Sequence, residues 1–232
     1  MKGPAVKILF CAIFLVWATF VGAQERRPGR PFPPEKIDIL EEPREWQKGK
    51  EVMRLLGVKE GDVVADIGAG SGYFAFLMAE RVGEEGLVYA GDIQQGMIDF
   101  MAKKIERSGI KNIKLVLGEP EDPKLPENSL DLAIMGNVYH EVENPVALMK
   151  SIYKELKPKG RLAIIDWSPM KPSPIGPPIE VRVHEHDLTR EAEEAGFYMI
   201  RRYRSWPYHY FIVFKKRRSI INMFDTLLKG SD

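Results

Sequence analysis

The stretch Asp62–Tyr73, which reads Asp-Val-Val-Ala-Asp-Ile-Gly-Ala-Gly-Ser-Gly-Tyr, decides the fold of this chain. Its first half is a short, nearly continuous apolar run, which is typical of a parallel strand covered by helices on both faces. Glycines at positions 68, 70 and 72 then form a turn, and the apolar residues 73–79 begin a helix. Because glycine lacks a Cβ atom, such a turn lets the backbone approach a ligand and directs helix N–H groups towards an anionic group.

The spacing of the glycines separates the classes of ligand that such a turn binds. A dinucleotide-binding turn, G-x-G-x-x-G/A, needs a small residue at position 73, where this chain has Tyr73. A phosphate-binding P-loop would need Gly-Lys-Ser/Thr after the turn, and the sequence has none there. An NAD-dependent oxidoreductase is therefore a disfavoured alternative.

The segments that follow alternate between strand and helix patterns. Apolar runs predict strands over residues 87–92, 112–117, 130–135 and 161–167, with helices over residues 73–82, 94–107 and 145–156 between them. A helix over residues 44–56 precedes the glycine turn, and two adjacent strands over residues 197–204 and 208–214 end the pattern. This alternation predicts an α/β fold with a doubly wound sheet.

Polar residues stand where two of these strands end. Asp92 lies 20 residues after Gly72, the distance at which nucleotide-binding α/β domains place a carboxylate that accepts hydrogen bonds from ribose hydroxyls. His140 follows the strand over residues 130–135 and is a candidate general base, because the ordinary pKa of histidine lies near neutrality. Alternatively, His140 only pairs with backbone at the start of the next helix, and an acceptor that is already nucleophilic needs no base.

The pattern Asp66-x-Gly68-x-Gly70-x-Gly72 resembles the first motif of the class I S-adenosylmethionine-dependent methyltransferases, of the type 11/25-like kind. The sequence Leu-Lys-Pro-Lys-Gly-Arg-Leu at residues 156–162 is a second point of resemblance, which extends over roughly residues 44–215. The resemblance implies a Rossmann-like, mostly parallel sheet with one antiparallel strand near the C-terminus and helices on both faces. It also implies S-adenosylmethionine as the cofactor and methyl transfer to a small-molecule acceptor.

The same resemblance assigns residues to the cofactor. The implied contacts are Asp66, Gly68, Ala69, Gly70, Gly72, Asp92, Ile93, Glu119 and Asn137. One position departs from the family, which usually has Gly-Asp-Ala where this chain has Gly118-Glu119-Pro120. Because proline has no N–H group, the usual backbone contact to the adenine ring is lost, and Asp122 is an alternative partner for adenine. An N-terminal helix often lies over the cofactor in this family, so Trp46 and Gln47 are expected to close the pocket.

Both ends of the chain carry segments of a different kind. In residues 1–23, two lysines precede an apolar run and small residues follow it, a layout that predicts a signal peptide cleaved after Ala23 and hence a periplasmic or secreted protein. An uncleaved membrane anchor is the alternative. Residues 24–43 are predicted to be a proline-rich, extended linker, residues 44–215 the methyltransferase domain, and residues 216–232 a basic and amphipathic tail. The tail is expected to contact an anionic membrane surface or to pack on the domain or on a second subunit.

Composition and two further motifs limit the function. A formal net charge of +1 gives no support to nucleic-acid binding, and the single cysteine, Cys11, lies in the predicted signal peptide, which excludes thiol chemistry in the mature chain. His184-x-His186 has metal-ligand spacing but lacks a third ligand at a fixed distance, so no metal is predicted. Residues 168–178 contain five prolines and form either a substrate lid or a plain connection.

A non-catalytic nucleoside-binding module is the second functional hypothesis. The predicted export signal suggests this hypothesis, because S-adenosylmethionine is made inside cells and an exported enzyme would be separated from its supply.

Overall fold

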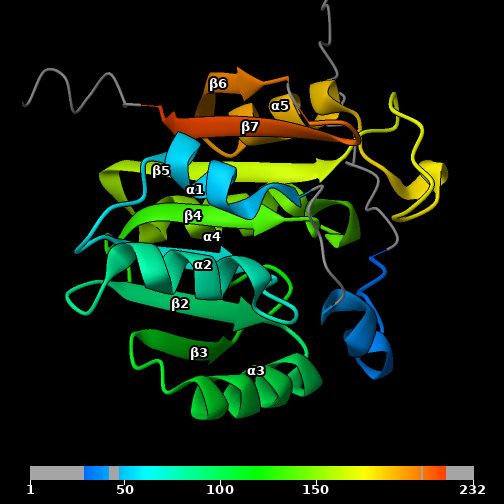
Figure 1. Ribbon diagram of the computed structural model, residues 1–232. Coiled ribbons are helices and arrows are strands. Elements are labelled where there is room, and N and C mark those ends of the chain that lie inside the picture. The colour runs from blue at the N-terminus through cyan, green and yellow to red at the C-terminus, as the bar shows by residue number, and fades with distance from the viewer. Residues whose placement is uncertain (1–28, 42–46, 205, 218–232) are drawn as a thin grey trace, which may run out of the picture.

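A computed structural model describes residues 29–41, 47–204 and 206–217, which form one central sheet with helices on both faces (Figure 1). The predicted signal peptide, Trp46 and residues 218–232 of the predicted tail lie outside the described residues. None of the helices in the described part of the chain combines the length and the apolar character that a membrane crossing requires.

The sheet has seven strands in the order β3-β2-β1-β4-β5-β7-β6. The strands are β1 (Val63–Ile67), β2 (Leu87–Asp92), β3 (Ile113–Leu117), β4 (Leu130–Gly136), β5 (Leu156–Trp167), β6 (Phe197–Tyr203) and β7 (His209–Lys216). Strands β1 to β5 are parallel, and β7 runs antiparallel to both of its neighbours. This order confirms the predicted Rossmann-like, mostly parallel sheet with one antiparallel strand near the C-terminus.

Helices cover both faces of the sheet because side chains alternate along each strand. Val64 and Ile134 belong to a core cluster that they share with helices on one face. Their neighbours Ala65 and Met135 belong to the cluster on the opposite face. The helices of the first face are α1 (Gly49–Leu56), α2 (Tyr73–Val82) and α3 (Gln95–Ser108), and those of the second are α4 (Pro145–Glu155) and α5 (Glu185–Glu194). Burial on both faces explains why the inner strands are continuous apolar runs.

Residues 29–41, which we call the strap, differ from the extended linker that their proline content predicts. Residues Pro34–Glu41 form a 3-10 helix, η1, that lies beside the carboxyl ends of the strands (Figure 1). Lys104 of α3 holds the end of η1 through an ion pair in which its Nζ is 2.8 Å from Oε1 of Glu41. A proline at the first helical position removes only an N–H group that would have no partner there, so these prolines are compatible with a short helix.

Glu155, at the end of α4, is a buried carboxyl group away from the strap. Its side chain is 2% exposed, Oε1 accepts a 3.1 Å hydrogen bond from the N–H of Leu125, and Oε2 is buried without a hydrogen-bond partner. Burial raises the pKa of Glu155 to about 7, although the Leu125 N–H opposes this shift. The folded protein therefore retains a proton that the unfolded chain has lost, and the stability present at low pH is lost as the pH rises through about 7.

We expect Glu155→Gln to raise the free energy of unfolding at pH 8 by about 1 kcal/mol, because the amide keeps an acceptor for Leu125 without a buried charge. Urea unfolding at pH 5 and pH 8 measures the effect, and the gain should be larger at pH 8. Glu127→Gln, at an exposed position, is the matched control and should change neither value. An equal effect of Glu155→Gln at both pH values would contradict the assignment.

Candidate active site

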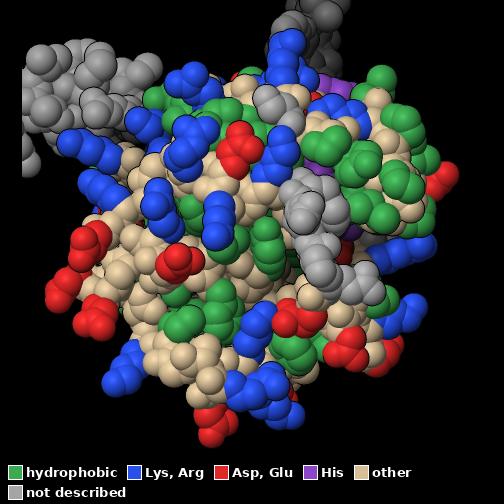
Figure 2. Space-filling model, viewed as in Figure 1, with side chains coloured by type: hydrophobic (Ala, Val, Ile, Leu, Met, Phe, Trp, Pro, Cys, Tyr) green, Lys and Arg blue, Asp and Glu red, His purple; other side chains and the backbone are tan. Residues whose placement is uncertain are grey.

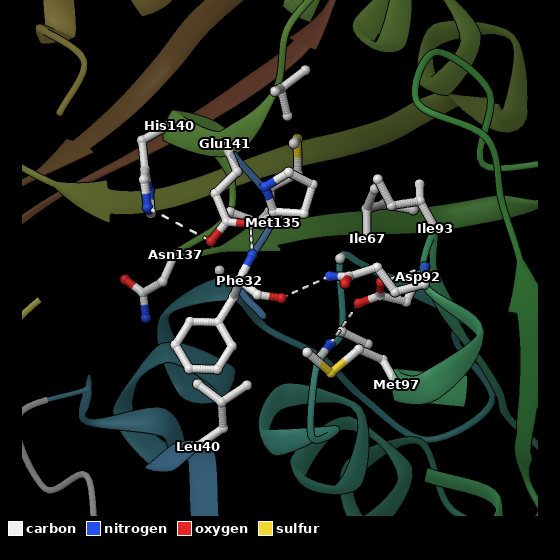
Figure 3. A pocket seen from close by; sticks show the side chains of 18 of the residues that line it. Phe32, Leu40, Ile67, Asp92, Ile93, Met97, Met135, Asn137, His140 and Glu141 are labelled. Atoms are coloured by element: carbon white, nitrogen blue, oxygen red, sulfur yellow. Dashed lines mark hydrogen bonds and ion pairs between the residues drawn. The ribbon is translucent and has the colours of Figure 1, made fainter. Parts of the chain in front are cut away.

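A cavity of about 810 Å³ opens at the carboxyl ends of β1, β2, β4 and β5. In this sheet β1 lies between β2 and β4. The chain continues from β1 into α2 on one face and from β4 towards α4 on the other, so the two connections diverge and a crevice forms between them. The cavity has the size of a pocket for a small ligand. Figure 3 shows that side chains from the strap, from the ends of β1, β2 and β4, and from the start of α3 converge on it.

The glycine turn forms one end of the cavity. Gly68, Ala69 and Gly70 line it, whereas Gly72 precedes the first residue of α2 and does not. The N–H groups of Gly68 and Ala69 both donate to the carbonyl of Gly91, at 2.9 Å, which fixes the turn to β2. Gly68 has a φ of 71°, and a Cβ atom there would lie 2.4 Å from a methyl group of Val138. Glycine is therefore required at position 68 by both conformation and packing.

Asp66 is a buried carboxyl group beneath the turn. Its side chain is 2% exposed, and Oδ2 accepts a 2.9 Å hydrogen bond from the N–H of Ala75 in the first turn of α2. Burial raises the pKa of Asp66 to about 7; the Ala75 N–H opposes this shift, and the nearby Asp92 adds to it. Asp66 thus joins the end of β1 to α2 and places a titratable group at the cavity.

Asp92 connects the glycine turn to the segment before α3. Its Oδ2 accepts from the N–H of Gly70 and its Oδ1 from the N–H of Gln94, both at 3.0 Å. Burial raises the pKa of Asp92, while the N–H groups of Gln94, Gly70 and Ile93 oppose that shift. Ile93 lies next to it on the cavity lining and is exposed. The structure therefore brings Asp92 to the glycine turn, as their sequence spacing predicts.

The end of β3 contributes the rim of the cavity. Gly118, Glu119 and Pro120 line it, and the carboxylate of Glu119 is exposed and forms an ion pair with Lys124. Asp122, the alternative adenine partner, is not among the lining residues. Its Oδ1 accepts a 2.8 Å hydrogen bond from the Lys124 N–H, and the neighbouring Pro123 lines the cavity.

Two amide side chains present unused acceptors among the described residues. Asn137, directly after β4, has a φ of 60° and donates its N–H to Ile165 at 2.8 Å. Its Oδ1 is buried without a hydrogen-bond partner, and the same holds for Oε1 of Gln47. Both residues line the cavity. Because a buried acceptor without a partner costs free energy, these two oxygens are suited to a donor that a ligand would bring.

His140 and Asp166 form a hydrogen-bonded pair at the ends of β4 and β5. Nδ1 of His140 is 2.8 Å from Oδ1 of Asp166, whose side chain is fully buried. Burial alone lowers the pKa of His140, but the carboxylates of Asp166 and Glu141 outweigh it, and the net pKa is raised. Burial likewise raises the pKa of Asp166, but His140 and backbone N–H groups hold it below its ordinary value.

Sequence reasoning found His140 and missed the role of Asp166. The sequence feature that could have indicated this role is the position of Asp166 at the end of the buried strand β5, which pairs with the strand that precedes His140. His140 lines the cavity, so the alternative in which it only pairs with backbone does not describe its side chain.

Glu141 links the strap to the site. Its Oε2 accepts a hydrogen bond from the N–H of Phe32, and Nε2 of Gln94 donates to the Phe32 carbonyl, both at 2.9 Å. Burial raises the pKa of Glu141 to about 7, opposed by His140 and by the Phe32 N–H. Figure 3 shows Phe32 next to Glu141, and the two hydrogen bonds place the strap across the site from the end of β2 to the end of β4. The sequence did not predict this contact.

The proline-rich segment 168–178 forms another wall. Ile175, Gly176, Pro177 and Pro178 line the cavity. The buried guanidinium of Arg182 donates to the carbonyls of Pro177, Ser168 and Lys171 at 3.0–3.3 Å, which holds the segment in place. The exposed apolar side chains of this wall are Met170 and Ile175, with Ile179 directly after it, and Figure 2 shows apolar side chains gathered at the right of the view.

The histidine pair of α5 lies apart from the cavity. The rings of His184 and His186 are 5.3 Å apart, and neither residue lines the cavity. Over residues 29–41, 47–204 and 206–217, no group of three or more histidine, cysteine, aspartate or glutamate side chains is arranged to hold a metal ion.

Comparisons with known proteins agree with this architecture. A family model described as a methyltransferase domain matches residues 58–204. The crystal structure of a SAM dependent methyltransferase from Aquifex aeolicus is 31% identical, with a TM-score of 0.75 over 79% of this chain and 98% of that chain. A putative type 11 methyltransferase from Sulfolobus solfataricus shares the fold, at 22% identity and a TM-score of 0.58 over 85% of this chain and 96% of that one.

A curated relative, a demethylmenaquinone methyltransferase from Listeria welshimeri, is 32% identical over 123 residues. This match covers 53% of the present chain and 51% of the relative. The chain therefore spans about half the length of the curated relatives that it matches.

We expect Gly68→Ala to lower the free energy of unfolding by about 2 kcal/mol, since the new methyl group meets Val138 at a φ that favours glycine. Adding Val138→Ala should recover part of this loss by removing the overlap but not the backbone strain. Thermal unfolding of the single and double variants measures both effects. A Gly68→Ala protein as stable as the wild type would contradict the packing described here.

Proposed function

The chain belongs to the class I S-adenosylmethionine-dependent methyltransferase domains, and from this premise we propose that it transfers a methyl group from S-adenosylmethionine to a small-molecule acceptor. The observation that carries the proposal is the cavity itself, which unites Asp92, the unused acceptor of Asn137 and the His140–Asp166 pair. When bound, the cofactor supplies an electrophilic methyl group on a positively charged sulfur.

The residues of the cavity fit the parts of this cofactor. Asp92 is placed to accept hydrogen bonds from the ribose hydroxyls, in addition to those from Gly70 and Gln94. The amide oxygens of Asn137 and Gln47 fit an ammonium group, which carries donors and no acceptor. Acidic residues that suit a cationic ligand also line the cavity, and they are Asp66, Asp92, Glu119, Glu141 and Glu143.

The adenine end is assigned to the rim formed by Gly118, Glu119 and Pro120, with Ile93 beside it. Pro120 offers no N–H group, so we assign adenine recognition there to Glu119 and to apolar contact with Ile93. The glycine turn, Gly68, Ala69 and Gly70, is assigned to the methionine end, and Gly72 acts through the start of α2.

His140 is the proposed general base, and its geometry favours a catalytic site over a non-catalytic nucleoside-binding module. A binding module needs the glycine turn and Asp92, but it has no use for a buried imidazole oriented by a second carboxylate at the cavity. An NAD-dependent oxidoreductase is further disfavoured because Tyr73 fills the place of a small residue and its hydroxyl accepts a 3.2 Å hydrogen bond from Gly49 of α1.

Calorimetric titration with S-adenosylhomocysteine tests the proposal, with NAD as the comparison ligand. We expect binding of the first and none of the second. Asp92→Asn should weaken binding by about 1–3 kcal/mol, because an amide is a poorer acceptor for ribose hydroxyls than a carboxylate. Glu106→Ala, at an exposed position on α3, is the control and should bind as the wild type does. Absence of heat with S-adenosylhomocysteine would refute the cofactor assignment.

The affinity for S-adenosylhomocysteine should also depend on pH. Its ammonium group favours ionised carboxyl groups, and the pKa values of Asp66 and Glu141 are raised to about 7 by burial. Below pH 7 binding must displace these protons, so the affinity should fall by up to about tenfold per pH unit for each proton released. Calorimetric titrations at pH 6 and pH 8, each in two buffers of different ionisation enthalpy, measure the affinity and the number of protons released on binding. An affinity independent of pH in this range would contradict the prediction.

A further inference from the structure

The pair formed by His140 and Asp166 also limits which acceptor this site serves. We propose that Asp166 is a positioning residue that holds Nε2 of His140 towards the cavity, and that the methyl acceptor is a neutral, largely apolar compound with a weakly acidic hydroxyl group, of the phenol or enol class. The acceptor part of this proposal rests on the proposed methyl transfer, whereas the positioning role of Asp166 stands on the geometry alone.

Asp166 fixes both the orientation and the tautomer of the imidazole. Its Oδ2 accepts the backbone N–H of His140 at 2.9 Å, and its Oδ1 accepts from the backbone of Trp167 at 2.6 Å and faces Nδ1 of His140 at 2.8 Å. An ionised carboxylate can only accept, so Nδ1 must carry the hydrogen. In the neutral ring Nε2 then has a free electron pair, which is what a general base needs.

The other ring nitrogen lies on the cavity side. Nε2 of His140 is 3.7 Å from Oε1 of Glu141, and the imidazole is 8% exposed. Figure 3 shows His140 and Glu141 facing each other beside Asn137. A hydroxyl group bound in this corner would have Nε2 as a proton acceptor and would lie near the methionine end assigned to the glycine turn and Asn137.

The charges around His140 select the acidity of the acceptor. The charged groups that act on it are Asp166 and Glu141, which favour the imidazolium, and Arg182, which opposes it. His209, which also neighbours this pair, has a pKa lowered to about 4 by burial and is therefore neutral near pH 7. The net pKa of His140 lies above the ordinary histidine value. Proton transfer is efficient when the donor acidity is near that of the base, which fits phenols and enols, whereas aliphatic alcohols are far less acidic. An anionic acceptor is disfavoured by the carboxyl groups of Glu141 and Asp92.

The walls of this corner are apolar. Phe32 from the strap, Trp167 at the end of β5, and Ile175 and Pro177 from the proline-rich wall line the cavity together with His140. Gly176 lies against Trp167 so closely that a Cβ atom there would be 2.7 Å from the indole ring. Aromatic and proline surfaces suit a flat apolar compound.

The proton and the electrons of the step balance within these groups. The hydroxyl oxygen forms a bond to the methyl carbon and gives its proton to Nε2 of His140, while the electron pair of the broken carbon–sulfur bond stays on sulfur. The positive charge thus moves to an imidazolium that the buried carboxylate of Asp166 stabilises.

Histidine ¹⁵N NMR of the full chain tests the positioning role without any ligand. The chain has four histidines, and His140→Gln identifies the signals of His140. We expect the Nδ1–H tautomer and a pKa above the ordinary value. In Asp166→Asn the tautomer should no longer be fixed, and the His140 pKa should fall, because Glu141 is then the carboxylate left to oppose the effect of burial. Asp187→Asn, beside the exposed His186, is the matched control and should leave the His140 signals unchanged.

If Asp166→Asn does not fold, the tautomer and the pKa of His140 in the wild-type spectrum test the positioning role by themselves. An Nε2–H tautomer, or a His140 pKa below the ordinary value, would overturn the positioning role.

Optical titration of the S-adenosylhomocysteine-loaded protein with 4-nitrophenol tests the acceptor class. We expect the wild type to bind the probe with a raised fraction of phenolate, and His140→Gln to bind it about tenfold more weakly without that spectral change. The affinity for 4-nitroanisole, which has no acidic proton, and for S-adenosylhomocysteine should be the same in both proteins. Equal binding of 4-nitrophenol by the two proteins, or stronger His140-dependent binding of 4-nitrobenzylamine, would overturn the hydroxyl class. Failure to bind S-adenosylhomocysteine would instead overturn the proposed function and leave the NMR result standing.

Discussion

The reversal of strand order at β1 is the constraint on which the rest of the structure depends. The chain adds β2 and β3 on one side of β1 and then returns to add β4 and β5 on the other. Connections that leave β1 and β4 diverge, so the crevice at their carboxyl ends is a consequence of topology. Asp66, at the end of β1, ties this edge to the first turn of α2 through the N–H of Ala75. Asn137 and His140 follow the neighbouring end of β4 and face the same crevice.

Buried carboxyl groups give the site its electrostatic character. Asp66, Asp92 and Glu141 have raised pKa values because burial outweighs the N–H groups that they accept from. Asp166 is as deeply buried, yet its pKa is lowered, since the imidazole of His140 supplies a partner that can carry positive charge. Asp166 therefore remains ionised without a ligand. The other three carboxyl groups, when ionised, attract a cation into the cavity.

Two segments outside the sheet close the cavity. The strap is held by Glu141 and Gln94 through the backbone of Phe32, and the proline-rich wall is held by the guanidinium of Arg182. In both cases side chains from outside the segment pair with its backbone groups. Proline-rich sequence does not by itself form a packed element, so its order here comes from these external partners.

The sequence by itself determined the doubly wound fold, the glycine turn and the position of Asp92, because strand periodicity and the spacing of one strand–helix–strand unit are local properties. The tertiary structure alone decided the contact of Phe32 with Glu141, 109 residues away, and the pairing of His140 with Asp166, 26 residues away. No local pattern encodes such contacts, since they arise only when the sheet brings the ends of β4 and β5 together and the strap crosses them.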